Sequence, residues 1–145
     1  MRSKHDSQMT PSTCQSKVWL YVYGPKVKIE DTLYSGKWMI FPSIKSVDAL
    51  WKQVKRYVEQ GKLGFAAKVS TLTQYLTLSG YKNFLICIYT RDWRDKTDVG
   101  KALKTIREIG VKGTLYYKSD EQTRQGIYAG GPKKASLYSS KDFEI

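Results

Sequence analysis

Three aromatic residues near the N-terminus alternate with aliphatic residues, in a spacing that could build a surface for stacking planar ligands. This segment has the period of a β-strand with aliphatic side chains on one face and rings on the other, namely Val18, Leu20 and Val22 against Trp19, Tyr21 and Tyr23. Lys68 lies in a later segment of strand character. Rings stack on bases and ammonium groups neutralise phosphate, so together on one sheet face they would form a platform for RNA or a phosphorylated nucleotide.

The same alternation adds further side chains to this platform. By strand parity it also receives Ser70, Tyr89, Tyr116 and Lys118. We predict as stacking residues Trp19, Tyr21, Tyr89, Tyr116 and, from a charged loop, Trp93. The predicted phosphate- or nucleic-acid-binding residues are Lys37, Lys68, Lys118 and Arg124. Each of these residues also has a possible structural role in place of binding. The aromatic residues could pack on one another across strands, and Trp93 could fold back as a lid. Lys68 could be a solvated strand residue, and Arg124 could form an ion pair with Asp120 or Asp92.

The charge balance supports an acidic partner. Lys and Arg number 25 against 13 Asp and Glu, which gives a formal net charge of +12 over 145 residues. Several of these cations fall on the solvent side of predicted helices, so only a fraction of the charge is available to a specific site. The excess nevertheless favours contact with a polyanion, and we expect such binding to weaken with salt.

Two helices and several strands must position these residues. The first helix begins at Ser46 as N-cap and ends near Gly61, with an apolar stripe of Val47, Leu50, Trp51, Val54 and Val58. The second helix is capped by Thr97 or Asp95 and ends at Gly110, with a stripe of Val99, Ala102, Leu103, Ile106 and Ile109. Strands are predicted at 18–23, 37–41, 64–71, 83–89, 114–118 and 135–138, with a polar loop at 72–82. This order favours an α+β fold, an antiparallel or mixed sheet with both helices on one face.

We expect the helices to cover the aliphatic face of that sheet. The residues assigned to this covered face are Val18, Leu20, Val22, Phe65, Val69, Phe84, Ile86 and Ile88. Trp38 and Trp51 are expected in the core. The rings and lysines would then be left on an open, concave face.

The length suits one domain, predicted at residues 17–145 after a flexible, polar tail at residues 1–16. The tail lacks the apolar region of a secretory signal, and no apolar stretch is long enough to cross a membrane, so no membrane partner is expected. Cys14 and Cys87 are expected to be free thiols in a reducing compartment, the cytoplasm or nucleus.

Motifs for catalysis, cofactors and metals were not found. The sequence contains no Walker A motif, no G-x-G-x-x-G, no H-E-x-x-H and no C-x-x-C, so we expect no cofactor and no metal. The single histidine, His5, lies in the tail, which leaves histidine-dependent nucleophilic mechanisms without their base. The acidic residues Asp92, Asp95 and Asp120 fall in predicted loops, where caps and turns are their usual roles. No catalytic residue is therefore predicted.

Four segments occur in an order that points to a known family: 34–41 (YSGKWMIF), 61–71 (GKLGFAAKVST), 86–95 (ICIYTRDWRD) and 117–124 (YKSDEQTR). Over about residues 18–138 the chain resembles the basophilic leukemia-expressed protein family. That family is similar to the cap-binding eukaryotic translation initiation factor 4E fold, a strongly curved antiparallel sheet with helices on its convex back. The resemblance implies the same architecture as the periodicity does.

The resemblance also implies functions. In the cap-binding factors two tryptophans sandwich the methylated guanine, but the stretch from Gly24 to Gly36 is too short for an equivalent loop and contains no Trp. What the resemblance implies here is a non-catalytic protein with phosphate contacts at Lys68, Lys118 and Arg124.

Two alternatives follow from the same relatives. Some are labelled phosphothreonine lyases, which implies an enzyme with Lys68 as base, Lys118 and Arg124 holding phosphate, and Tyr89 or Tyr116 in place of an acid histidine. The related initiation factors bind protein partners on their helical back, which implies a protein-interaction module.

Overall fold

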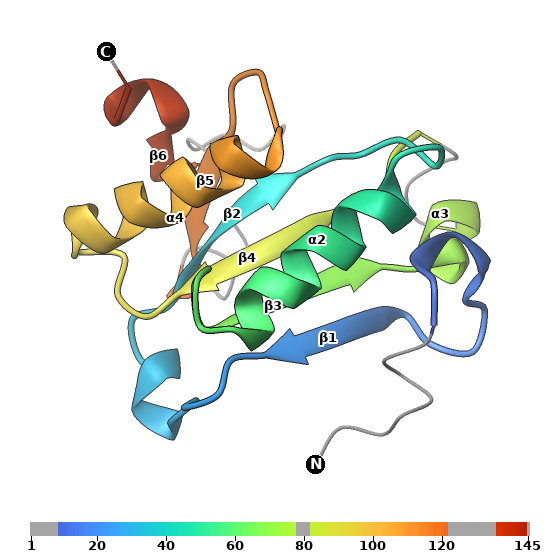
Figure 1. The fold of residues 1–145 in the computed structure, drawn as a ribbon, viewed down its shortest axis with the longest axis horizontal. Helices are drawn as coiled ribbons and strands as arrows, with labels where there is room; N and C mark the ends of the chain where they lie inside the picture. The colour runs from blue at the N-terminus through green and yellow to red at the C-terminus, as the bar shows by residue number, and fades with distance from the viewer. Residues whose placement is uncertain (1–8, 78–81, 122–135, 145) are drawn as a thin grey trace.

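The computed structural model describes residues 9–77, 82–121 and 136–144. Within them, six strands form one open sheet in the order β1-β3-β4-β2-β5-β6, and every neighbouring pair is antiparallel (Figure 1). The strands are β1 (Trp19–Tyr23), β2 (Gly36–Ile40), β3 (Ala66–Ser70), β4 (Ile86–Thr90), β5 (Tyr116–Ser119) and β6 (Tyr138–Ser139). The predicted α+β class with an antiparallel sheet is confirmed.

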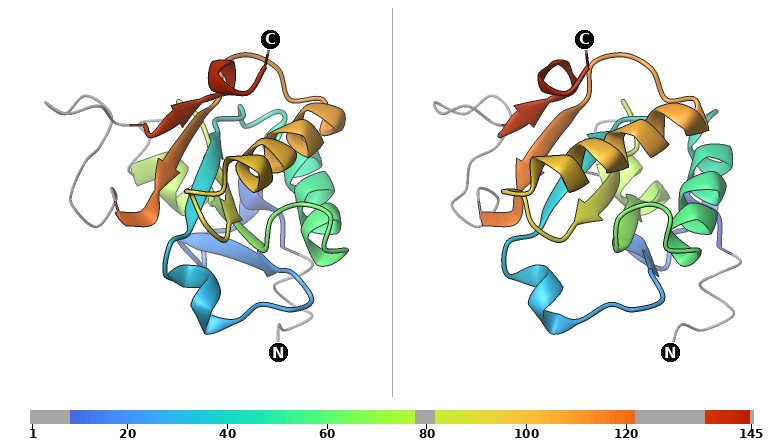
Figure 2. Two further views of the ribbon diagram at one scale, coloured as in Figure 1. Left: turned by 90° about the vertical axis from the view of Figure 1, so that its left-hand side faces the viewer. Right: turned by 60° about the vertical axis from the view of Figure 1, so that its left-hand side comes forward.

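Two long helices pack on the convex face of the curved sheet, α2 (Val47–Glu59) and α4 (Lys96–Ile109). Figure 2 shows both helices on the same side of the strands. Shorter elements are α3 (Leu72–Thr77) and the 3-10 helices η1 (Pro11–Thr13), η2 (Ile29–Thr32) and η3 (Ser140–Asp142). No helix among the described residues is long and apolar enough to span a bilayer.

The two long helices form where the apolar stripes predict them. Helix α2 buries Val47, Trp51, Val54 and Val58 against the sheet. Helix α4 has Asp95 as its N-cap, whose side chain accepts a hydrogen bond from the Asp98 amide at 3.2 Å, and it ends at Gly110 in the left-handed conformation. Ser46 occupies the N-cap position of α2 but makes no side-chain cap there.

The core lies between these helices and the aliphatic face of the sheet. Trp38 is fully buried, and its indole Nε1 donates to the Val99 carbonyl of α4 at 2.9 Å. Other buried strand residues on this side are Leu20, Val22, Val69, Ile86 and Ile88. Phe84, just before β4, is buried with them. The predicted division of the sheet into an aliphatic and an aromatic face therefore holds within the strands.

Two residues assigned to the covered face lie elsewhere. Val18 precedes β1 and is 49% exposed. Phe65 precedes β3, and its ring centroid lies 6.3 Å from that of Tyr89, a residue of the opposite face. The alternation of side chains between the two faces applies only within a strand. It could therefore not predict on which face Val18 or Phe65 lies, since each precedes its strand.

The predicted polar loop at 72–82 is wrong in its first half, because Leu72–Thr77 forms helix α3. The Tyr75 ring of this helix stacks on Phe84, with centroids 4.9 Å apart. Residues 78–81 lie outside the described residues.

The prediction of a flexible tail at residues 1–16 is wrong for η1 and Cys14. Pro11 and Cys14 are buried, and η1 packs against α2. The Ser12 amide donates to one carboxylate oxygen of Asp48 at 2.9 Å, and its hydroxyl donates to the other. Residues 1–8, which include His5, lie outside the described residues. Cys14 and Cys87 are both buried free thiols.

Candidate nucleic-acid interface

The face of the sheet opposite α2 and α4 carries the predicted rings and cations. Lys68 of β3 is paired with Tyr21 of β1 on one side and with Cys87 of β4 on the other. Lys37 of β2 is likewise paired with Tyr89 of β4 and Lys118 of β5. Directly paired residues of antiparallel strands point to the same face, so all these side chains share it.

A hollow of about 400 Å³ lies on this face. Its aromatic walls are the rings of Tyr21, Tyr23, Phe65 and Tyr89, and its charged groups are Lys37, Lys68 and Asp120. We call this space the sheet-face hollow. Its volume falls in the range of about 300–1,000 Å³ that is typical of small-ligand pockets. The combination of rings with two ammonium groups suits a ligand that has both a planar and an anionic part.

Lys68 sits where the rings and the hollow meet. Its ammonium nitrogen lies 3.9 Å from the centroid of the Trp19 ring, a cation–π contact. Burial lowers the pKa of Lys68, and the nearby cation of Lys37 lowers it further, while Cys87 and Asp120 act in the opposite direction. Trp19 therefore borders the hollow through Lys68 and is not itself among the lining residues.

Lys37 is held by an acidic residue on the wall of the hollow. Its ammonium nitrogen lies 2.7 Å from a carboxylate oxygen of Asp120, and the Ser35 hydroxyl donates to the other oxygen. Asp120 directly follows β5, whereas the sequence predicts it only as a loop residue or a partner for Arg124. The ion pair reduces the positive charge that Lys37 offers to an anion.

Lys118 and Tyr116 share the face but not the hollow. Lys118 is only 6% exposed, and burial, followed by repulsion from Lys37, lowers its pKa. Tyr116 is 46% exposed and lines a different groove. Lys118 and Tyr116 therefore lie outside the sheet-face hollow, although their strand positions belong to the same face of the sheet.

Trp93 requires a correction. Instead of standing exposed in a charged loop, it is half-buried against the core, and its carbonyl accepts a hydrogen bond from the Tyr138 hydroxyl at 2.8 Å. Its indole nitrogen is buried without a hydrogen-bond partner. Trp93 does not line the sheet-face hollow. Arg124, the remaining predicted phosphate ligand, lies outside the described residues.

Two aromatic residues of the hollow were not predicted as binding residues. Tyr23 stands parallel to Tyr21, with an interplanar angle of 5° and ring centroids 6.2 Å apart. Phe65 follows Gly64, whose φ of +56° belongs to the left-handed region, and this turn carries its ring to Tyr89. Burial is the main cause that raises the pKa of Tyr89, so this phenol stays neutral. The alternation of residues 19–23 could have identified Tyr23 as a binding residue. No pattern in the sequence could have identified Phe65.

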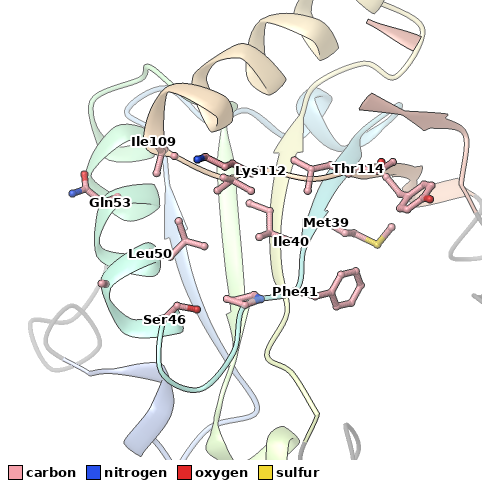
Figure 3. A pocket seen from close by; sticks show the side chains of 15 residues that line it. Met39, Ile40, Phe41, Ser46, Leu50, Gln53, Ile109, Lys112 and Thr114 are labelled. Carbon is pink, nitrogen blue, oxygen red and sulfur yellow. The ribbon is translucent and has the colours of Figure 1, made fainter. Parts of the chain in front are cut away.

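A second space lies on the side of the long helices. Figure 3 shows side chains from β2, α2 and the segment after α4 converging on a groove of about 710 Å³. Apolar groups dominate it, among them Ile40, Phe41, Leu50 and Ile109, with Gln53 and Lys112 as polar members. We call it the helix-side groove. Its apolar lining contrasts with the charged sheet-face hollow.

The described part of the chain contains no group of three or more His, Cys, Asp or Glu residues that could hold a metal ion.

Solved structures similar to this chain include eIF4E proteins. A schistosome eIF4E complexed with m7GpppA and 4E-BP matches with a TM-score of 0.60 and 15% identity, covering 83% of this chain and 69% of that one. Ascaris suum eIF4E-3 with m7G cap matches with a TM-score of 0.63 and 12% identity, covering 96% of this chain and 81% of that one. At such identities the likeness establishes the fold.

Sequence comparison is more specific. The family model described as basophilic leukemia-expressed protein Bles03 matches residues 10–125, which include η1 and extend past β5. The chain therefore belongs to the Bles03 family, and its fold is that of eIF4E.

Proposed function

We propose that this protein binds single-stranded RNA or a phosphorylated nucleotide in the sheet-face hollow and does not catalyse a reaction there. The observation that carries the proposal is the meeting of Lys68 with the rings of Tyr21, Tyr23 and Tyr89 around one space. With RNA as its ligand, the protein would act in the cytoplasm or nucleus.

The chemistry of the hollow suits a nucleotide in two ways. Each base stacked on an aromatic side chain contributes about 1–3 kcal/mol to binding. The ammonium of Lys68 is partly withdrawn from water, where attraction to a phosphate is stronger than at a fully solvated site. Trp19, against this ammonium, limits the directions in which it can point.

The similar solved structures support a nucleotide as the ligand, since they are eIF4E proteins crystallised with cap nucleotides. The aromatic residues available here come from β1, from the residue before β3 and from β4, and no Trp lies between Gly24 and Gly36. We therefore propose recognition of base and phosphate without a requirement for the methylated cap.

A fluorescence anisotropy titration with a labelled ten-nucleotide single-stranded RNA tests the proposal. We expect Lys68→Ala and Tyr21→Ala each to weaken binding by about tenfold, since a hydrogen bond to a charged group or one stacked base contributes about 1.5 kcal/mol, and Tyr21 is an exposed ring of the hollow. Lys52→Ala, which removes an exposed lysine of α2, is the matched control and should bind like the wild type.

Two results would contradict the proposal. Undetectable or salt-independent RNA binding would remove it, because phosphate contacts release counterions. Elimination of phosphate from a phosphothreonine peptide, detected by mass as a dehydrated residue and lost in Lys68→Ala, would replace it with the lyase alternative, for which the lowered pKa of Lys68 is a favourable property in a base.

The helix-side groove favours a second candidate function, docking of a protein segment. Its apolar lining between α2 and the end of α4 would accept apolar side chains of a partner (Figure 3). Leu50→Asp would place a charge in the groove, so a pull-down partner lost in Leu50→Asp and kept in Lys68→Ala would support docking. A partner lost in Lys68→Ala alone would contradict it.

A further inference from the structure

A second, smaller hollow of about 320 Å³ lies beside the sheet-face hollow and gathers cations from three separate segments. Lys62 comes from the turn after α2, Arg91 follows β4, and Lys101 lies on α4. Gly61, Gly64, Asp98 and Ala102 complete its lining. We call it the edge hollow. Three cationic side chains brought together from distant parts of the chain suit an anionic group.

The two hollows share a wall at residues 64 and 65. Gly64 lines the edge hollow and Phe65 lines the sheet-face hollow. The Phe65 amide donates to the Tyr89 carbonyl at 3.0 Å, which fixes this wall to β4. The guanidinium carbon of Arg91 lies 5.9 Å from the centroid of the Phe65 ring. A ligand that leaves the sheet-face hollow across Phe65 therefore arrives at Arg91.

The charges of the edge hollow leave it cationic. Arg91 is paired with Asp31 at 2.9 Å, and Asp98 is the carboxylate of the lining. These two acids face three cations, of which Lys62 and Lys101 are exposed to solvent. The edge hollow thus keeps a positive excess, and its two lysines are accessible to a ligand.

We propose that the ligand is an oligonucleotide, an inference that rests on the proposed RNA-binding function. One nucleotide occupies the sheet-face hollow, and the strand crosses the wall at residues 64 and 65. A neighbouring phosphate is then bound in the edge hollow by Lys62, Lys101 and Arg91. A mononucleotide fills only the sheet-face hollow. The edge hollow therefore makes affinity depend on ligand length.

The test compares two probes on the same variants. A double variant, Lys62→Ala with Lys101→Ala, is titrated with a labelled decauridylate and with uridine 5′-monophosphate. The matched control is Lys52→Ala with Lys104→Ala, which removes the same charge from exposed positions of α2 and α4. All four side chains are solvent-exposed, and circular dichroism verifies that the variants fold.

Loss of two phosphate contacts should reduce the slope of log affinity against log salt by about 1.4, at about 0.7 per contact on a single strand. Between 50 and 200 mM salt the wild type should therefore lose about sevenfold more affinity for decauridylate than the double variant does. The affinity for uridine 5′-monophosphate should remain that of the wild type.

Several results would overturn the oligonucleotide path. A wild-type salt slope in the double variant, together with loss of binding in Lys68→Ala, would leave the proposed function standing and remove the edge hollow from it. An equal reduction in the control would show that net charge alone is responsible. If wild-type protein binds neither probe, both proposals fail.

Discussion

Replacing Gly64 by Ala should be the most informative single change in the wall between the two hollows. A Cβ at this position would lie 2.2 Å from the backbone oxygen of Tyr89, far inside van der Waals contact. That oxygen belongs to β4, which is paired on both sides, so it cannot move away. The substitution must therefore shift the wall and weaken the hydrogen bond from the Phe65 amide.

The expected cost has three parts. A residue with a Cβ in the left-handed region costs about 1–2 kcal/mol, and the φ of +56° at Gly64 is close to the left-handed minimum. Overpacking adds about 1–3 kcal/mol, and the hydrogen bond lost with it about 1 kcal/mol. We therefore expect Gly64→Ala to lower the free energy of unfolding by about 3–6 kcal/mol.

Gly113→Ala separates these parts. Gly113 also has a positive φ, +82°, but nothing lies within 4 Å of its would-be Cβ. Urea denaturation should therefore give Gly113→Ala only the backbone cost, about 1–2 kcal/mol, with an unchanged m-value. If Gly64→Ala is no more destabilising than Gly113→Ala, the close approach to Tyr89 does not matter and the reasoning is refuted.

Three further outcomes are expected. Asp120→Asn removes a negative charge beside Lys37. Calorimetry should therefore show that decauridylate binds about two- to fivefold more tightly, equivalent to about 0.5–1 kcal/mol. Weaker binding would mean that Asp120 is needed to orient Lys37. Burial lowers the pKa of Lys68, so raising the pH should weaken binding already at a pH lower than that at which lysines usually deprotonate. Lys68→Arg should abolish this loss, because arginine stays protonated. The same loss at alkaline pH in the arginine variant would show that another group titrates. Burial raises the pKa of Cys87 to about 11, so this thiol should react with Ellman's reagent at pH 8 only after the protein is unfolded in urea. The reaction is followed in Cys14→Ser, where Cys87 is the remaining thiol. Rapid labelling of the native variant would contradict the burial of Cys87.

Local periodicity was enough to predict much of this fold. The stripe ending at Val58 and the cap at Asp95 define the two long helices from neighbouring residues alone. Alternation in β1 placed Tyr21 on the exposed face and Leu20 in the core because the whole segment is paired. Lys68 follows the same rule in β3, which is why the sequence could place it beside the rings.

The remaining features depend on contacts that no local pattern contains. The ion pair of Lys37 with Asp120 joins residues 83 positions apart. Phe65 leaves its expected face because the left-handed turn at Gly64 comes before the strand begins. Trp93 is half-buried because its side chain packs against the core, and the Tyr138 hydroxyl, 45 positions later in the chain, donates to its carbonyl. In each case tertiary packing determines where the side chain lies. The charge or exposure inferred from neighbouring residues in the sequence does not determine it.

The hydrogen bonds between Ser12 and Asp48 bear on where this protein can be shortened. A fragment starting at Lys17 would lose Pro11 and Cys14 from the interior and leave the Asp48 carboxylate without these two donors. Such a truncation would uncover apolar surface on α2 and make the fragment prone to aggregate. Expression of the minimal folding unit should therefore start no later than Met9.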